Sequence, residues 1–197
     1  MTCGFSMLPL IPYFERFLPL SDPEKQLIGE RVTSRRVRRK QALLQEGFPC
    51  KHYTFVCEGC FRLFSVDPKG TEHNLQFAAE NEWIADIGSF HSGRPSQLFI
   101  EAIEPASILQ IEKQDLYHLY ETIPKLDRIF KVIIEDKYVE LQNRVLQAIS
   151  STAQDRYVTF LQQYPSLANR LPNTQIASYL GITPEFLSKI RRDLATA

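Results

Sequence analysis

Short runs of alternating apolar and polar residues fill the first part of the chain and predict β-strands. Ile100 and Ala102, for example, alternate with Phe99 and Glu101, as in a strand with one buried face. The predicted strands are Arg35–Arg39, Ala42–Gln45, Tyr53–Glu58, Phe61–Asp67, Glu72–Ala78, Glu82–Asp86, Gln97–Ile103 and Ser107–Glu112. Eight short strands without alternating strand–helix units favour an antiparallel sandwich or jelly roll.

Turn signals separate these strands. Asp67–Gly70 contains Pro and Gly at positions that suit a four-residue turn. Glu58-Gly59 predicts a two-residue hairpin turn between its neighbours. Ahead of the strands, Ser21 and Glu24 predict the capped start of a helix that runs to about Arg31.

Beyond residue 112 the apolar residues recur at three- and four-residue spacing, which predicts helices. These are expected at Lys113–Glu121, Lys125–Ser150 and Ala153–Tyr164. The stripe along Lys125–Ser150 is roughly 37 Å long, at about 1.5 Å per residue. A second copy of the helix is the expected cover for it, through Ile129, Ile133, Tyr138, Leu141 and Val145. The alternative is that the stripe packs only on its own sheet and the following helices.

The last segment has the pattern of a helix-turn-helix. A short helix over about Thr174–Leu180 carries apolar residues on one face, and Gly181 follows at a position suited to a left-handed turn. Thr183 then caps a second helix that begins at Pro184. Two helices joined in this way predict a DNA-binding module.

The outward face of the second helix carries the residues expected to contact DNA. Lys189 can donate to guanine and Glu185 can accept from cytosine. Arg191, Arg192 and Thr174 suit phosphates. The predicted DNA-binding set is Thr174, Thr183, Glu185, Ser188, Lys189, Arg191 and Arg192. The alternative for this segment is a helix pair that only packs on the rest of the protein.

Composition and charge narrow the function. The 197 residues include 23 Lys+Arg and 23 Asp+Glu, so any contact with nucleic acid must come from a local patch. The run of basic residues from Arg31 to Lys40 could be such a patch, but the favoured interpretation is a solvated edge strand protected by charge. The chain contains no apolar run long enough for a membrane helix and its start does not look like a signal peptide, so we expect a cytoplasmic protein.

A β-roll, a long helix and a C-terminal helix-turn-helix together resemble the CRP/FNR family of bacterial transcription regulators. The residues that carry the resemblance are Glu46-Gly47, Val56–Gly59 with Arg62, the Asp67–Gly70 turn with Glu72, Trp83–Phe90, and Ile176–Glu185. The resemblance implies an α+β protein with three parts. These are an effector β-roll (residues 1–124), a dimerisation helix (125–150) and a helix-turn-helix domain (151–197). The expected partners are double-stranded DNA, a second copy of the chain and RNA polymerase.

The resemblance also points to an effector pocket. Family members that bind cyclic nucleotides carry Gly-Glu-Leu-Gly followed by Arg-Ser or Arg-Thr, whose Glu holds the ribose and whose Arg holds the phosphate. Here Ala85–Gly88 and Ser96-Gln97 stand at these places, and Arg94 comes two residues early. The expected pocket residues are Trp83, Asp86, Ile87, Gly88, Ser89, Arg94, Ser96 and Gln97. We therefore expect an effector other than cyclic AMP, of unknown identity, and no cofactor.

Two other interpretations have some support. Cys50, Cys57 and Cys60, with distant Cys3, could sense redox state or hold a metal, although their spacing does not match the N-terminal cysteine cluster of oxygen-sensing family members. A jelly-roll metal enzyme is the remote alternative. The four histidines do not form the ligand pattern it needs, and no nucleophile elbow or phosphate loop occurs. The sequence therefore predicts a regulator rather than an enzyme.

Overall fold

The computed structural model describes residues 9–195, which form two compact units. The first unit comprises residues 9–64 and 77–134, and the second comprises residues 65–76 and 135–195. The division falls inside the long helix α5 (Pro124–Ser150), and the loop between β4 and β5 belongs to the second unit. Cys3 lies outside the described residues.

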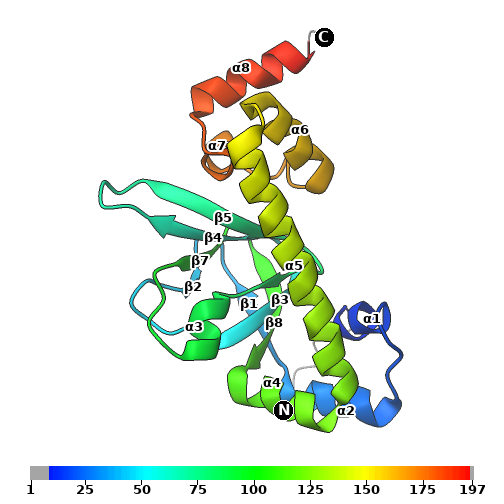
Figure 1. Ribbon diagram of the computed structural model, residues 1–197. Helices are drawn as coiled ribbons and strands as arrows, with labels where there is room; N and C mark the ends of the chain where they lie inside the picture. The colour runs from blue at the N-terminus through cyan, green and yellow to red at the C-terminus, as the bar shows by residue number, and fades with distance from the viewer. Residues whose placement is uncertain (1–8, 196–197) are drawn as a thin grey trace. The chain divides into compact units, whose positions relative to one another are not determined.

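The first unit is built on an antiparallel β-roll, in agreement with the predicted jelly roll (Figure 1). Within residues 9–195 there are eight strands: β1 (Thr33–Val37), β2 (Ala42–Leu44), β3 (His52–Glu58), β4 (Phe61–Val66), β5 (Glu72–Ala78), β6 (Trp83–Ile84), β7 (Phe99–Ala102) and β8 (Ala106–Glu112). They form two four-stranded sheets, in the orders β1-β8-β3-β6 and β2-β7-β4-β5. Every predicted strand is present, with bounds shifted by a few residues at most.

The connection between β3 and β4 is not a hairpin, because the two strands belong to different sheets. Gly59 makes the crossing with a φ of +95°. A Cβ at this position would lie 2.6 Å from the Ala106 Cβ and 2.8 Å from the Pro105 carbonyl oxygen. Only glycine fits here, since both the backbone conformation and the space exclude a side chain.

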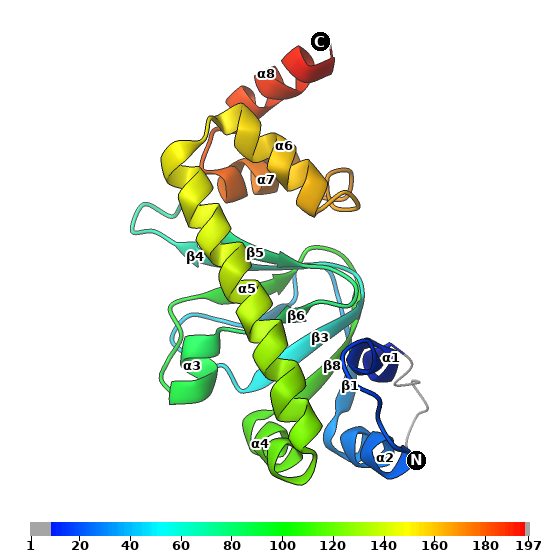
Figure 2. The same ribbon diagram turned by 45° about the vertical axis from the view of Figure 1, so that its right-hand side comes forward.

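The helices of the first unit are α1 (Leu10–Glu15), α2 (Asp22–Arg31), α3 (Ile87–Ser92), α4 (Lys113–Thr122) and the first part of α5. The predicted cap of α2 is present, with the Ser21 N–H donating to Glu24 Oε2 at 2.6 Å. The helices α1 and α3, which have six residues each, were not predicted from the sequence. α2 packs on α4, and α4 packs on β8 (Figure 2).

Aromatic side chains dominate the core of the roll. Trp83 lies with its ring centroid 5.1 Å from those of Phe55 and Phe130. Phe14 from α1 stacks on the same indole at 6.1 Å. Because Phe130 belongs to α5, the first turns of that helix are part of the core of the roll.

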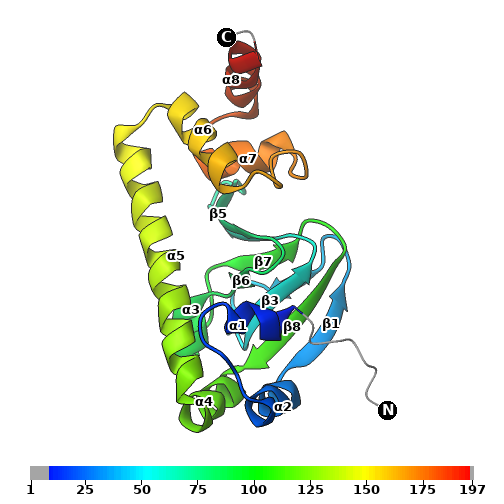
Figure 3. The ribbon, with the colours of Figure 1, turned by 90° about the vertical axis from the view of Figure 1, so that its right-hand side faces the viewer.

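The second unit contains the rest of α5 and the helices α6 (Ala153–Gln163), α7 (Asn173–Leu180) and α8 (Pro184–Ala195) (Figure 3). Each of these helices was predicted to within one or two residues. The β4–β5 turn also belongs to it, and Asp67 Oδ1 accepts from the N–H groups of Lys69 and Thr71 at 2.8 and 3.0 Å. These backbone hydrogen bonds and His73 lower the pKa of Asp67. Among residues 9–195, no helix has both the length and the apolar character needed to cross a bilayer.

Candidate functional site

The turn between α7 and α8 is held by backbone geometry that the sequence predicted. Gly181 ends α7 in the left-handed conformation with a φ of +67°. The Ile182 N–H donates to the Ala177 carbonyl at 3.0 Å, which closes the helix end. Thr183 Oγ1 accepts from the Phe186 N–H at 3.2 Å and caps α8. The relative orientation of α7 and α8 is therefore fixed by local hydrogen bonds and by the burial of Ala177.

One face of α8 is buried and the other is open. Leu187 and Ile190 are buried, whereas the neighbouring Phe186 is 46% exposed. The outer side carries the predicted DNA-contacting residues. Those that are exposed are Glu185, Ser188, Lys189 and Arg192 on α8, together with Thr183 at its cap and Thr174 on α7. A first turn that is exposed and polar is the feature by which a recognition helix reaches base edges.

Arg191 differs from the other members of the predicted set. Its Nε donates to the Tyr157 hydroxyl at 2.8 Å, and its Nη1 donates to Asn173 Oδ1 at 2.5 Å. The guanidinium also lies over the Tyr157 ring, 5.5 Å from its centroid. Arg191 therefore joins α8 to α6 and α7, and its donors are used inside the unit rather than being available to phosphates.

The residues predicted for the dimer divide at the middle of α5. Ile129 and Ile133 are only 1% and 4% exposed, because they pack in the core of the roll. They offer almost no area to a second chain, which corrects the predicted seam. Tyr138, Leu141 and Val145 are 60%, 54% and 51% exposed, and Ile149 continues the same stripe at 80%. The uncovered part of the stripe thus begins at Tyr138, nine residues after the predicted start of the seam at Ile129.

The segment expected to hold the effector bonds to itself. Asp86 caps α3, accepting from the Ser89 N–H at 3.1 Å and from the Ser96 hydroxyl at 2.6 Å. Ser89 Oγ accepts from the Cys50 N–H at 2.8 Å and donates to the Arg94 carbonyl at 2.6 Å. Asp86, the acid expected at the ribose-binding place, therefore already has two hydrogen-bond partners from its own segment.

The remaining pocket residues lie in different environments. Trp83 is 3% exposed and belongs to the aromatic core, not to the lining of an open pocket. Ile87, Gly88, Arg94 and Gln97 are exposed. The structure brings Asp86, Ser89 and Ser96 together but does not aim the Arg94 guanidinium at them, since no hydrogen bond or ion pair joins that side chain to these residues in the described part of the chain.

The three described cysteines are free thiols with limited exposure. Burial raises the pKa of Cys57 to about 11 and also raises the pKa of Cys50. A sensing thiol needs the opposite shift, because the thiolate is the reactive form. Within residues 9–195, no group of three His, Cys, Asp or Glu side chains is arranged to hold a metal ion.

Most of the basic run lies on, or directly after, the edge strand β1. Among the strands of residues 9–195, β1 pairs only with β8, and its first four residues are exposed. A groove of about 1010 Å³ runs beside it, lined by residues that include Arg36, Arg38, Arg39 and Lys40. This arrangement agrees with the interpretation of a charged, protected edge.

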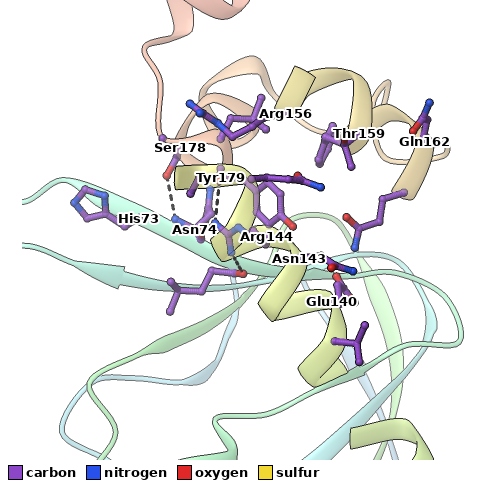
Figure 4. Close-up of a pocket in the computed structure, with 18 of the residues that line it drawn as sticks. His73, Asn74, Glu140, Asn143, Arg144, Arg156, Thr159, Gln162, Ser178 and Tyr179 are labelled. Atoms are coloured by element: carbon purple, nitrogen blue, oxygen red, sulfur yellow. Dashed lines mark hydrogen bonds between the residues drawn. The ribbon is translucent and has the colours of Figure 1, made fainter. Parts of the chain in front are cut away.

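A cavity of about 760 Å³ in the second unit was not predicted (Figure 4). Its lining comes from α5, α6, α7 and β5, and includes Asn74, Arg144, Arg156 and Tyr179. Arg144 lies over the Tyr179 ring, 3.9 Å from its centroid, and donates to the carbonyls of Asn74 and Tyr179 at 2.9 Å. Burial raises the pKa of Tyr179. The residues come from parts of the chain about a hundred positions apart, so no local pattern announces them.

Comparison with known proteins gives a consistent result. Residues 34–123 match the family described as the cyclic nucleotide-binding domain. The chain is 23% identical over 168 residues to electron transport regulator A of Shewanella oneidensis, covering 78% of this chain and 65% of that protein. It is 24% identical over 170 residues to the transcriptional activator protein anr of Pseudomonas aeruginosa, covering 79% of this chain and 68% of that protein. The chain therefore spans about two thirds of the length of these relatives.

Solved structures share the fold over most of the chain. FixK2 from Bradyrhizobium japonicum superposes with a TM-score of 0.72 at 20% identity, covering 84% of this chain and 85% of that one. A transcriptional regulator from Eubacterium rectale, described as of the CRP/FNR family, gives a TM-score of 0.71 at 15% identity, covering 94% of this chain and 88% of that one.

Proposed function

We propose that this chain, a CRP/FNR family member with a cyclic nucleotide-binding domain, regulates transcription by binding double-stranded DNA as a homodimer. The observation that carries the proposal is the geometry of α7 and α8. A hydrogen-bonded glycine turn holds α8 with Glu185, Ser188 and Lys189 exposed near its start. Such a helix can enter the major groove, where a Lys ammonium donates to guanine and a Glu carboxylate accepts from cytosine.

The homodimer is supported by the second half of α5. Tyr138, Leu141 and Val145, with Ile149, form an exposed apolar stripe at three- and four-residue spacing. A second copy of the same stripe is its expected cover, because a coiled pair of helices buries such positions against each other. A two-fold dimer would present two copies of α8 to a pseudo-palindromic site whose half-site centres lie roughly 34–36 Å apart.

We propose that the effector, where one acts on this domain, is not cyclic AMP or cyclic GMP. Asp86 already accepts hydrogen bonds from Ser89 and Ser96, and Ser96-Gln97 stands in place of the Arg-Ser or Arg-Thr dipeptide whose arginine would compensate a cyclic phosphate. RNA polymerase as a partner and the cytoplasm as the location follow from the proposed regulatory function. Both belong to the proposal.

The DNA-binding proposal can be tested by selection from random double-stranded DNA at several salt concentrations. The wild-type chain is expected to select a two-fold symmetric sequence. Lys189→Ala is expected to weaken binding to that site by about 1–3 kcal/mol and to relax one base position in each half. Arg39→Ala in the β-roll is the matched control and should leave the selected sequence unchanged. An unchanged sequence with Lys189→Ala would remove its base-reading role, and no selection at all would overturn the function.

A further inference from the structure

The cavity in the second unit has a buried acceptor without a partner. Asn74 is 1% exposed, and its Nδ2 donates to the Gln175 carbonyl at 3.0 Å and to Gln175 Oε1 at 2.8 Å. Because both of these neighbours are acceptors, the amide must turn its nitrogen toward Gln175. Its oxygen, Oδ1, therefore lies on the other side. Asn74 Oδ1 has no hydrogen-bond partner in the described part of the chain. A buried amide oxygen in this state lacks a hydrogen bond that a donor on a ligand would supply.

The same cavity has a buried donor without a partner. Arg156 donates from Nη1 to the Ser151 carbonyl at 3.0 Å, while its Nε is buried and unpaired among residues 9–195. No carboxylate pairs with Arg156 in that range. Of the two acids in the lining, Glu140 is bound by Lys137 at 2.9 Å, and Asp136 is exposed to solvent. The guanidinium of Arg156 is thus available to an anion.

The wall between these groups is partly apolar. Val139, Phe160 and Tyr179 line it, and Tyr179 is held by Arg144 above its ring. The volume of about 760 Å³ is in the range of small-molecule sites. Figure 4 draws the side chains that line the cavity and labels Asn74, on β5, and Arg156, on α6, among them.

We propose that this cavity binds a small amphipathic anion, of the class of aromatic hydroxycarboxylates. Its carboxylate pairs with Arg156, its ring lies against Val139 and Tyr179, and its hydroxyl donates to Asn74 Oδ1. Ser178 and Tyr179 in the lining belong to α7, so an occupant contacts the first helix of the helix-turn-helix. Use of the site to regulate DNA binding rests on the proposed function, whereas occupancy of the site does not.

The test is isothermal titration calorimetry on the full chain without DNA, so that its result is independent of the DNA proposal. The probes are para-hydroxybenzoate, benzoate, which lacks the donor, and benzyl alcohol, which lacks the charge. We expect saturable binding of one para-hydroxybenzoate per chain, weaker binding of benzoate, and affinity lower by roughly tenfold or more for benzyl alcohol.

Two variants probe the site by different means. Arg156→Gln removes the charge and should lower the affinity for both carboxylates by roughly tenfold while leaving benzyl alcohol unchanged. Val139→Trp fills the cavity from an exposed position and should abolish binding of all three. Arg39→Gln makes the same charge change in the first unit and should have no effect. Thermal melts identify variants that fail to fold.

The proposal is overturned if neither carboxylate binds saturably to the wild-type chain, which is the result expected when only water satisfies Asn74 and Arg156. It is equally overturned if the carboxylates bind but folded Arg156→Gln and Val139→Trp bind them as tightly as wild type does.

Discussion

The β-roll and the second unit use their polar side chains differently. In the roll, Asp86, Ser89 and Ser96 are joined by hydrogen bonds, so the segment expected to hold an effector is closed by the protein's own contacts. In the second unit, Lys189 is exposed on α8, and Asn74 Oδ1 and Arg156 Nε are left without partners within residues 9–195. The difference teaches that the fold of a domain does not reveal which of its polar groups are free to bind a ligand. That has to be found by checking each buried donor and acceptor for a hydrogen-bond partner.

The largest expected effect separates the two halves of α5. Ile133→Glu places a carboxylate in the core of the roll and should destabilise the fold by about 4 kcal/mol or more. The double change Leu141→Glu with Val145→Glu alters exposed positions, so it should leave the fold intact and yield monomers. Circular dichroism melts and sedimentation velocity measure the two outcomes. A double variant that stays dimeric would move the interface elsewhere.

The Cys57 thiol is a second polar group of the roll that is not available for chemistry, because burial disfavours its reactive thiolate form. With a pKa raised to about 11, it should react with iodoacetamide at neutral pH about a hundredfold more slowly than an ordinary thiol. Its rate should rise about tenfold per pH unit until the pH reaches that value, because only the thiolate reacts. Timed alkylation followed by peptide mass spectrometry reports the rate. Fast modification at pH 7 would restore the redox-sensing alternative.

Removal of Asp86 tests how tightly the effector segment is closed on itself. Asp86→Ala leaves the Ser89 N–H and the Ser96 hydroxyl without their acceptor and should reduce the free energy of unfolding by about 1–3 kcal/mol. Gln97→Ala, at an exposed position of the same segment, should change it by less than about 0.5 kcal/mol. Urea unfolding of both variants gives the comparison. Equal effects would mean that the hydrogen bonds of Asp86 do not stabilise the segment.

Two neighbouring arginines sharpen the same contrast inside α8. Arg191→Ala removes the bonds to Tyr157 and Asn173 and should cost about 1–2 kcal/mol of stability. Arg192→Ala, at an exposed position, should leave the stability nearly unchanged. It should instead weaken binding to all DNA sequences alike. The slope of the logarithm of the binding constant against the logarithm of the salt concentration should become less steep by about one. Thermal melts and salt-dependent DNA titrations distinguish them, and a reversal of the two patterns would exchange their roles.

The smallest expected effect is the addition of cyclic AMP or cyclic GMP. Because Asp86 already has hydrogen-bond partners and Ser96-Gln97 lacks the phosphate-holding arginine, neither nucleotide should give saturable heat in calorimetry. Micromolar affinity for either one would contradict the closed segment. Arg94→Ala would then be the first variant to measure.

Much of the fold follows from local pattern, because strands and long helices repeat their signal over several residues. All eight predicted strands in residues 9–195 occur, as does each of the predicted helices. The short α3 was missed although its signals exist: Asp86 as N-cap, and Gly93 ending the helix at a φ of +71°. α1 has only six residues, with Pro9 before it and Pro12 within it, so periodicity cannot reveal it.

The site was harder to predict, because its decisive contacts join distant parts of the chain. Periodicity places Arg191 on α8, but its hydrogen bond to the Tyr157 hydroxyl depends on how α6 and α8 pack. The apolar stripe of α5 is continuous in sequence, and only the roll decides that Ile133 is covered while Leu141 is not. Asn74, in the lining of the cavity, bonds to Gln175, which lies 101 positions further along the chain. No local sequence pattern reveals a contact over such a separation.

The pairing of β1 with β8 has a kinetic consequence. Thr33 bonds to Gln110, 77 positions further on, so the roll cannot close until nearly its whole length is present. Closing a loop of this size carries a large entropy cost before any contact offsets it, and folding of the roll should be slow. Until then β1 is an unpaired strand in a collapsed chain, which is the state that leads to aggregation. The charges of Arg35 and Arg36 in the middle of β1 would keep copies apart during that interval, as gatekeeper residues do in other β-proteins.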